Sequence, residues 1–224
     1  MRKRKLEMIL SSLSDIEDPR RDLEQYPTPV DLVSDILFDA AGSGDVAGRK
    51  VSELGCGNGP FSIGAYLLGA DEVIGYDIDP RCIRAAQRNA DDIMDGPFSS
   101  NLTGRIYFRK ADVGDIDFKP ERVHTVFMNP PFGSQRKGAD RPFIEKAVSM
   151  AEIVYSVHNA NTIDFLRKEI DRKGGTILSE KVYKMKLDNR YPHHTKDRVF
   201  VDVAVLRIGG ESYDEPRRLE DPRR

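Results

Sequence analysis

The distribution of apolar residues along the chain predicts alternating strands and helices from about residue 50 onward. Short apolar runs bounded by glycine, proline or charged residues indicate buried strands, and apolar residues spaced three or four positions apart indicate helices. The expected strands are 51–54, 72–76, 105–110, 123–128, 153–157, 176–187 and 199–208. The expected helices in this pattern are 30–40, 60–68, 80–90, 139–150 and 160–171.

Repeated alternation of strand and helix predicts an α/β fold. Such a chain forms a mainly parallel sheet, here of seven strands, with helices on both faces. The last two strands are joined by a polar loop with no helix between them, so they are expected to form a C-terminal antiparallel pair.

The two ends of the chain depart from this alternation. Residues 1–24 indicate an amphipathic helix followed by a charged segment, and 23–29 (LEQYPTP) indicates an extended link stiffened by proline. The tail, 209–224, lacks apolar periodicity and is expected to be disordered. The main domain is therefore expected over residues 25–208.

Composition restricts the class of protein further. The 224 residues, 39% of them hydrophobic, suffice for one large domain with a core. No run of about 18 apolar residues predicts a membrane span, and the basic N-terminus lacks the features of a signal peptide. Cys56 and Cys82 are far apart in sequence, which disfavours a disulfide framework or metal cluster and favours a reducing, cytoplasmic location.

Charge is distributed unevenly along the chain, although the net charge is only −2. Residues 1–120 carry 15 Lys/Arg and 21 Asp/Glu, whereas residues 121–208 carry 16 and 11. A polyanion such as a nucleic acid would therefore be attracted to the second half. The alternative is that these basic side chains only solvate surface helices.

A glycine-rich turn follows the first strand of the alternating region. Gly55, Gly57 and Gly59, with Asn58 between them, let the backbone approach a ligand at the start of a helix. The dinucleotide-binding fingerprint requires a glycine at position 60, where this chain has proline. The spacing G-x-G-x-G, preceded by the acidic Glu53, resembles the first motif of Rossmann-like S-adenosylmethionine-dependent methyltransferases. The alternative is a strand–helix connection without a ligand.

Acidic residues follow the next two expected strands. Asp77 ends the second strand about 20 residues after the glycine turn, where such folds bind ribose hydroxyls. Asp112, with its neighbour Val113, follows the third strand. In the resembled class, an acid there accepts a hydrogen bond from the adenine amino group of the cofactor. Asp79 is expected to be the N-cap of the following helix instead.

A stiff corner, Asn129-Pro130-Pro131-Phe132, follows the fourth strand. An amino group on a base, or a side-chain amide, is planar and a poor nucleophile because its lone pair is delocalised. The Asn129 side-chain oxygen and the Pro130 carbonyl can each accept one N–H and aim the lone pair at a methyl donor. Phe132 can stack on the planar substrate. The alternative is a plain proline turn.

The order Asn-Pro-Pro-Phe after the fourth strand is similar to the motif of amino-group methyltransferases. More narrowly, the stretches LEQYPTP, ELGCGNGPFSIGAYLLGA, IGYDID, MNPPFGS, IVYSVH and VDVAVLRI together resemble the methyltransferase-like protein five family of ribosomal-RNA adenine-N6 methyltransferases and its archaeal relatives. The resemblance covers about residues 20–208. It implies a Rossmann-like class I methyltransferase fold, S-adenosyl-L-methionine as cofactor, and an adenosine N6 in RNA, in small-subunit ribosomal RNA, as acceptor.

The resemblance also implicates the link before the core, which touches the cofactor in that family; the residues here are Gln25 and Thr28. It further implies a small zinc-binding activator subunit as partner. The third strand, 105–110, is expected to be a sheet edge where such a partner can add a strand. The alternative is an edge protected by its flanking basic residues.

Basic residues near the corner suit contacts with RNA phosphates. These are Arg136, Lys137, Arg141 and Lys196. A metal site at His193-His194 is disfavoured because further ligands are missing nearby in sequence.

Three functions stay open on the sequence. The first is methylation of adenosine N6 in RNA; the second applies the same chemistry to DNA adenine or to a protein glutamine amide; the third is a non-catalytic, cofactor-binding ribosome-assembly factor. Glutamine modifiers of the resembled type carry Tyr after the prolines and a separate N-terminal helical domain, whereas this chain has Phe132 and a short N-terminal segment. Intact Asn129, Pro130 and Asp77 argue against the third.

Overall fold

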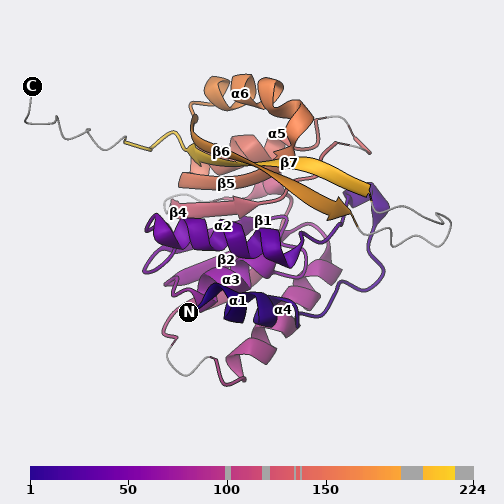
Figure 1. Ribbon diagram of the computed structural model, residues 1–224, viewed down its shortest axis with the longest axis vertical. Helices are drawn as coiled ribbons and strands as arrows, with labels where there is room; N and C mark the ends of the chain where they lie inside the picture. The colour runs from indigo at the N-terminus through magenta and orange to yellow at the C-terminus, as the bar shows by residue number, and fades with distance from the viewer. Residues whose placement is uncertain (99–101, 118–121, 134, 137, 188–198, 215–224) are drawn as a thin grey trace, which may run out of the picture.

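Seven strands form one sheet in the computed structural model, which describes residues 1–98, 102–117, 122–133, 135–136, 138–187 and 199–214 (Figure 1). Their bounds are β1 Lys50–Leu54, β2 Glu72–Asp77, β3 Arg105–Lys110, β4 Val123–Met128, β5 Ala151–Asn159, β6 Thr176–Leu187 and β7 Val199–Gly209. The strand order is β3-β2-β1-β4-β5-β7-β6. The strands β1 to β5 are parallel, and β7 is antiparallel to both neighbours. The predicted sheet, with its C-terminal antiparallel pair, is confirmed.

Helices cover both faces of this sheet (Figure 1). Within the described ranges they are α1 Lys3–Leu10, α2 Val30–Gly42, α3 Pro60–Leu67, α4 Pro80–Met94, α5 Arg141–Met150 and α6 Ile163–Arg172. Short 3-10 helices are η1 Arg21–Leu23, η2 Val113–Asp115 and η3 Ala160–Thr162. Helix α4 continues beyond the expected end at residue 90, because Ile93 keeps helical spacing with the buried Ala86 and Ala90. No described helix meets the length and hydropathy needed to cross a membrane.

The core is divided by the sheet into two clusters. In β4, Phe127 belongs to the first cluster, with residues of α1 to α4, whereas Val126 and Met128 belong to the second, with residues of α5 and α6. Successive residues of a strand point to opposite faces, which explains this division. The Phe127 ring stacks between Phe61, at 5.4 Å between centroids, and Tyr155, at 5.3 Å. This packing holds the strand that ends just before Asn129.

Residues 3–10 and 210–213, near the two ends of the chain, contact the main domain. Helix α1 buries Leu6, Ile9 and Leu10 in the first cluster, and Lys3 pairs with Asp35 of α2. Of the expected tail, residues 209–214 are described: Gly210 N donates to Glu152 O at 2.8 Å, and Tyr213 packs against the first cluster. Residues 215–224 lie outside the described ranges.

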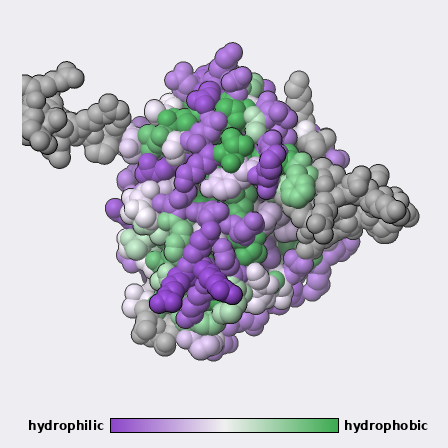
Figure 2. Space-filling model, in the orientation of Figure 1, coloured by the Kyte–Doolittle hydropathy of each residue, from purple (hydrophilic) through white to green (hydrophobic). Residues whose placement is uncertain are grey.

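On the face shown in Figure 2, hydrophobic residues form separate patches between hydrophilic ones. This face carries no continuous apolar band among the residues that are coloured there. The carboxyl ends of the parallel strands lie on the right of Figure 1.

Candidate active site

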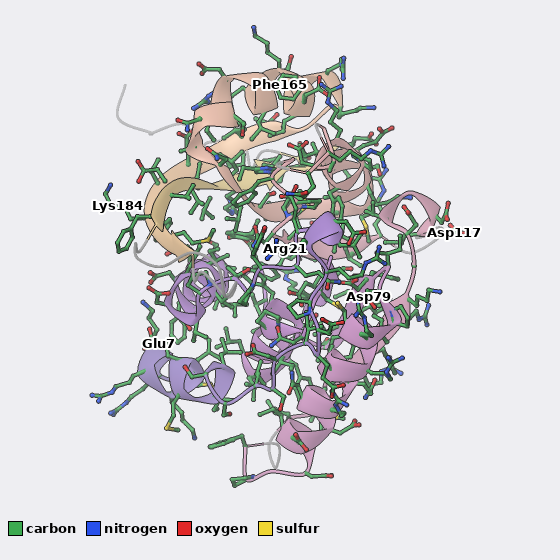
Figure 3. The ribbon with its side chains drawn as sticks, turned by 90° about the vertical axis from the view of Figure 1, so that its right-hand side faces the viewer. Glu7, Arg21, Asp79, Asp117, Phe165 and Lys184 are labelled. Atoms are coloured by element: carbon green, nitrogen blue, oxygen red, sulfur yellow. The ribbon has the colours of Figure 1, made fainter. Side chains whose placement is uncertain are left out.

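The carboxyl ends of β1, β2 and β4 meet a cavity of about 1280 Å³. Pockets for small ligands usually measure about 300–1,000 Å³, so this one has room for a cofactor and part of a second ligand. Figure 3 looks onto this edge, where the labelled Arg21 marks η1 in front of the strand ends, between Lys184 of β6 and Asp79 before α4. The N-terminal segment between α1 and α2 thus lines the cavity from the outside.

The glycine turn forms one wall of the cavity. Gly55, Gly57 and Gly59 have φ of +70°, +53° and +86°, a left-handed conformation that side chains disfavour. A Cβ at Gly59 would also lie 3.1 Å from the Phe108 ring. Asn58 donates from Nδ2 to Ser14 O at 3.0 Å, which ties the turn to the N-terminal segment. The glycines therefore permit a turn whose backbone borders the cavity directly.

Glu53 binds the start of the helix that follows this turn. Its buried carboxyl accepts from Ser62 N at 2.7 Å, Ser62 Oγ at 2.5 Å and Phe61 N at 3.3 Å, all at the start of α3. Burial raises the pKa of Glu53 to about 8, against the effect of these donors. Cys56, in the turn itself, is fully buried, and burial raises its pKa well above the usual range. Cys56 is therefore a buried, packed thiol.

Asp77 faces the cavity from the end of β2. Its Oδ2 accepts from Gly57 N and its Oδ1 from Asp79 N, both at 2.9 Å. Desolvation raises the pKa of Asp77, and the two N–H donors oppose that rise. Each carboxylate oxygen has further lone pairs, so contact with a ribose hydroxyl stays a prediction that this geometry permits. Asp79 is the N-cap of α4 and accepts from Arg81 N at 2.9 Å, as expected.

Asp112 and Val113 lie after β3 and also line the cavity. The exposed Asp112 carboxylate accepts from Gly114 N at 2.9 Å and so caps η2. Val113 is half-buried against the second core cluster. Their predicted contact with an adenine ring stays a prediction.

Gln25 and Thr28, from the link before α2, line the same cavity. The Gln25 amide is used within the protein, because Nε2 donates to Asp79 Oδ2 at 3.0 Å and Oε1 accepts from Arg20 N at 2.7 Å. The Arg81 guanidinium on the other side of Asp79 holds the pKa of that carboxyl well below its usual range. Gln25 thus fastens the link to the start of α4, and its contact with a cofactor stays a prediction.

Thr28 orients the amide of Asn129. Asn129 Nδ2 donates to Thr28 Oγ1 at 2.9 Å, whereas Asn129 Oδ1 is buried and has no hydrogen-bond partner among the described residues. A buried acceptor without a partner costs about 1–3 kcal/mol, so its presence beside a cavity points to a ligand donor. The amide is held so that its oxygen is available to accept an N–H.

The rest of the corner continues this wall. Pro130 is buried, and Pro131 lines the cavity. Phe132 is half-buried, packs against the first core cluster and is not among the residues that line the cavity. The predicted stacking of Phe132 on a substrate stays a prediction.

Sequence reasoning missed several residues that surround the corner. Aromatic side chains that do line the cavity include Tyr26 of the link, Tyr183 of β6 and Phe200 of β7. Glu24 accepts from Phe132 N at 2.8 Å and from Gln135 N at 2.9 Å. In the sequence, only the position of Glu24 next to Gln25 in the link could have indicated a role for Glu24 at this site.

The predicted RNA-binding residues are only partly described. Arg136 is exposed and lines the cavity. The Arg141 guanidinium lies over the Phe165 ring, 4.9 Å from its centroid, and does not line the cavity. Lys137, Lys196 and the His193-His194 pair lie outside the described residues.

Known proteins are similar to this chain in sequence, and solved structures are similar to it in fold. A family model described as ribosomal protein L11 methyltransferase (PrmA) matches residues 38–102, a region that includes Asp77 but not Asn129. An uncharacterized protein of Methanocaldococcus jannaschii is 37% identical, with 93% of this chain and 94% of that protein covered. The rRNA N(6)-adenosine-methyltransferase METTL5 of Danio rerio is 32% identical, with 93% and 99% covered. The chain belongs to the METTL5 family.

A solved structure agrees with this assignment. A Pyrococcus horikoshii protein described as a candidate RNA methyltransferase superimposes with a TM-score of 0.82 at 34% identity, over 94% of this chain and 98% of that one. The METTL5-family chain is accordingly a Rossmann-like methyltransferase that uses S-adenosyl-L-methionine, as the sequence predicted. The glycine turn, Asp77 and the unpaired Asn129 oxygen fit a cofactor and an amine acceptor in one cavity.

Proposed function

We propose that this METTL5-family enzyme methylates the N6 amino group of an adenosine in ribosomal RNA, in the small subunit. The observation that carries the proposal is the buried Asn129 Oδ1, which has no hydrogen-bond partner in the described part of the chain and borders the cavity beside the glycine turn. The names of the Danio rerio and Drosophila melanogaster relatives, both rRNA N(6)-adenosine-methyltransferases, support this acceptor.

The chain itself supplies positioning and hydrogen-bond acceptors. Asn129 Oδ1 accepts one N–H of the adenine amino group, and the Pro130 carbonyl accepts the other. These bonds draw the nitrogen toward a tetrahedral shape, so its lone pair becomes available for attack. S-adenosylmethionine supplies an electrophilic methyl group when bound. The nitrogen lone pair would form the new N–C bond as the S–C bond breaks, with its electrons left on sulfur. The nitrogen would then lose a proton, and no strong base is needed because the amine becomes acidic once methylated.

Basic residues next to the corner are proposed to hold the RNA backbone. Arg136 lies at the cavity, and the Arg141 guanidinium is already ordered over Phe165. A guanidinium held by an aromatic ring loses little freedom when it binds a phosphate. Lys137 and Lys196 are proposed to add phosphate contacts.

The acceptor is tested by methyl transfer with labelled S-adenosylmethionine on ribosomal RNA, DNA and protein fractions, followed by analysis of the modified nucleoside. N6-methyladenosine in small-subunit RNA supports the proposal. Label in DNA or in glutamine instead supports the same chemistry on another acceptor, and cofactor binding without transfer to any fraction supports a non-catalytic assembly factor. Asn129→Ala protein serves as the control for contaminating activity.

A small zinc-binding activator protein is proposed to bind at β3. This strand forms one edge of the sheet, and Tyr107 in its middle is 39% exposed. An edge strand offers backbone groups to which a partner can add a strand. Tyr107→Pro, which removes one backbone donor, should abolish co-purification with the activator, whereas Tyr107→Ala should retain it. Equal recovery with both variants of unchanged melting temperature would place the partner elsewhere.

The site of action is proposed to be the cytoplasm. Cys56 and Cys82 are both buried and free, a state that suits a reducing compartment. Fractionation of cells that express a tagged chain, with the ribosomal fraction followed separately, tests this location.

A further inference from the structure

Glu24 bonds to the backbone of the catalytic corner from a distant part of the sequence. Its two carboxylate oxygens each accept one N–H: Oε2 from Phe132 at 2.8 Å and Oε1 from Gln135 at 2.9 Å. Hydrogen bonds from two N–H groups to one carboxylate are charge-assisted and directional. They tie the link before α2 to the loop after β4.

The corner has few other means of backbone support. Pro130 and Pro131 have no N–H, so Phe132 carries the first backbone donor after Asn129. Because the proline rings fix φ at two successive residues, a restraint on Phe132 N is transmitted to the Pro130 carbonyl and to Asn129. Glu24 thus binds the backbone N–H that lies nearest in sequence to the Asn129–Pro130 acceptors.

The backbone of Glu24 indicates that its side chain is needed there. Glu24 ends η1 in the left-handed region with φ of +51°, where glycine is the usual residue. Asp18 is the only other described non-glycine residue with positive φ. A strained residue is retained when its side chain performs a task that glycine cannot.

We propose that Glu24 is a positioning residue for methyl transfer, which aligns the Asn129–Pro130 acceptors by fixing the backbone of the corner. It acts together with Thr28, four residues later in the same link, which fixes the Asn129 amide itself. The link thereby sets both the backbone and the side-chain orientation of the acceptor pair. This inference rests on the proposed function for its rate effects, but not for its structural claim.

The test uses three variants of the full chain. Glu24→Gly removes the carboxylate and suits the left-handed backbone, so the link should keep its path. Glu24→Gln keeps one acceptor oxygen. Asp18→Gly is the control, because it removes a carboxylate at φ of +50° in the same segment; that exposed carboxylate lies 3.7 Å from the Arg81 guanidinium. Each variant is measured for cofactor affinity by calorimetry, for single-turnover methylation with saturating cofactor, and for amide hydrogen exchange at Phe132 and Gln135.

In Glu24→Gly, we expect hydrogen exchange at the Phe132 and Gln135 amides to be faster than in the parent. The variant should bind cofactor within about twofold of the parent affinity. Its methylation rate should fall by up to about 10²-fold, since small misplacements of reacting groups have effects of this size. Glu24→Gln should lie between Glu24→Gly and the parent, and Asp18→Gly should match the parent. A parent-like rate in Glu24→Gly overturns the proposal. So does an equal loss of rate in Asp18→Gly, because it assigns the effect to the segment as a whole.

The exchange measurement separates this proposal from the proposed function. If the parent protein methylates no RNA, protection of the Phe132 and Gln135 amides still reports whether Glu24 holds the corner. Unchanged exchange in Glu24→Gly means that these hydrogen bonds do not restrain the loop, and the positioning role is then refuted whatever the acceptor.

Discussion

Substitution of Asn129 by alanine should separate catalysis from stability. The Asn129 amide makes one hydrogen bond within the protein, from Nδ2 to Thr28 Oγ1 at 2.9 Å, and its buried Oδ1 makes none with the described residues. Alanine removes both groups at once. The variant therefore loses a bond and also loses a buried acceptor that had no partner.

The two effects on stability oppose each other. Loss of the hydrogen bond should destabilise the folded protein by about 0.5–1.5 kcal/mol, and removal of an unpaired buried acceptor should stabilise it by about 1–3 kcal/mol. We expect the free energy of unfolding to change by no more than about 2 kcal/mol in either direction, with a small void opposing any gain. Loss of one transition-state hydrogen bond should instead lower the rate by about 10²–10³, or about 2.7–4 kcal/mol in the barrier.

Urea denaturation and single-turnover methylation of RNA with saturating cofactor measure these two quantities on the same preparation. Asn129→Asp is the companion variant, because its carboxylate can still accept an N–H from the substrate and should retain part of the rate. Asn129→Ala protein that reacts at the parent rate would show that the proline corner is only a turn. A strongly destabilised Asn129→Ala would instead show that Oδ1 has a structural partner.

Three further substitutions probe the cofactor wall, the RNA surface and the buried acid. Asp77→Ala should weaken binding of S-adenosylmethionine by about 1–3 kcal/mol in calorimetry, and unchanged affinity would remove the predicted ribose contact. Arg136→Ala should lower RNA affinity and reduce the salt slope by about one unit, with cofactor affinity unaltered. Burial raises the pKa of Glu53 to about 8, so this carboxyl keeps its proton to higher pH in the folded protein than in the unfolded chain. The stability that Glu53 contributes is therefore fully present below its unfolded pKa, and it is lost as pH rises through about 8. Glu53→Gln, which does not titrate, should show a flatter dependence of unfolding free energy on pH between about 5 and 8, and equal slopes would contradict the assignment.

The sequence predicted those parts of the site that depend on local pattern. Asp77 and Asn129 each follow a short apolar run, and parallel strands bring such positions to one edge. The glycine spacing predicted a turn, and all three glycines have the left-handed conformation that the turn needs. Strand periodicity and turn chemistry are local properties, so one sequence is enough to read them.

Contacts between distant segments could not be predicted in this way. Glu24 and Phe132 are 108 positions apart, and no periodicity links a charged link residue to a backbone N–H in another loop. The partners of Gln25 were equally hidden, because its amide bonds with Asp79 only after the link has crossed the strand ends. The direction of the Phe132 ring depends on core packing, which the motif does not specify.

The strand order also has a consequence for synthesis of the chain. Strand β7, which follows β6 in the chain, lies between β5 and β6 in the sheet and pairs with both. In the described sheet β6 pairs with β7 alone, so β6 cannot form its native pairing until residues 199–209 have been made. At a synthesis rate of about 5–20 residues per second, strands β1 to β5 can therefore pair before β7 is made, whereas β6 can join the sheet only after β7.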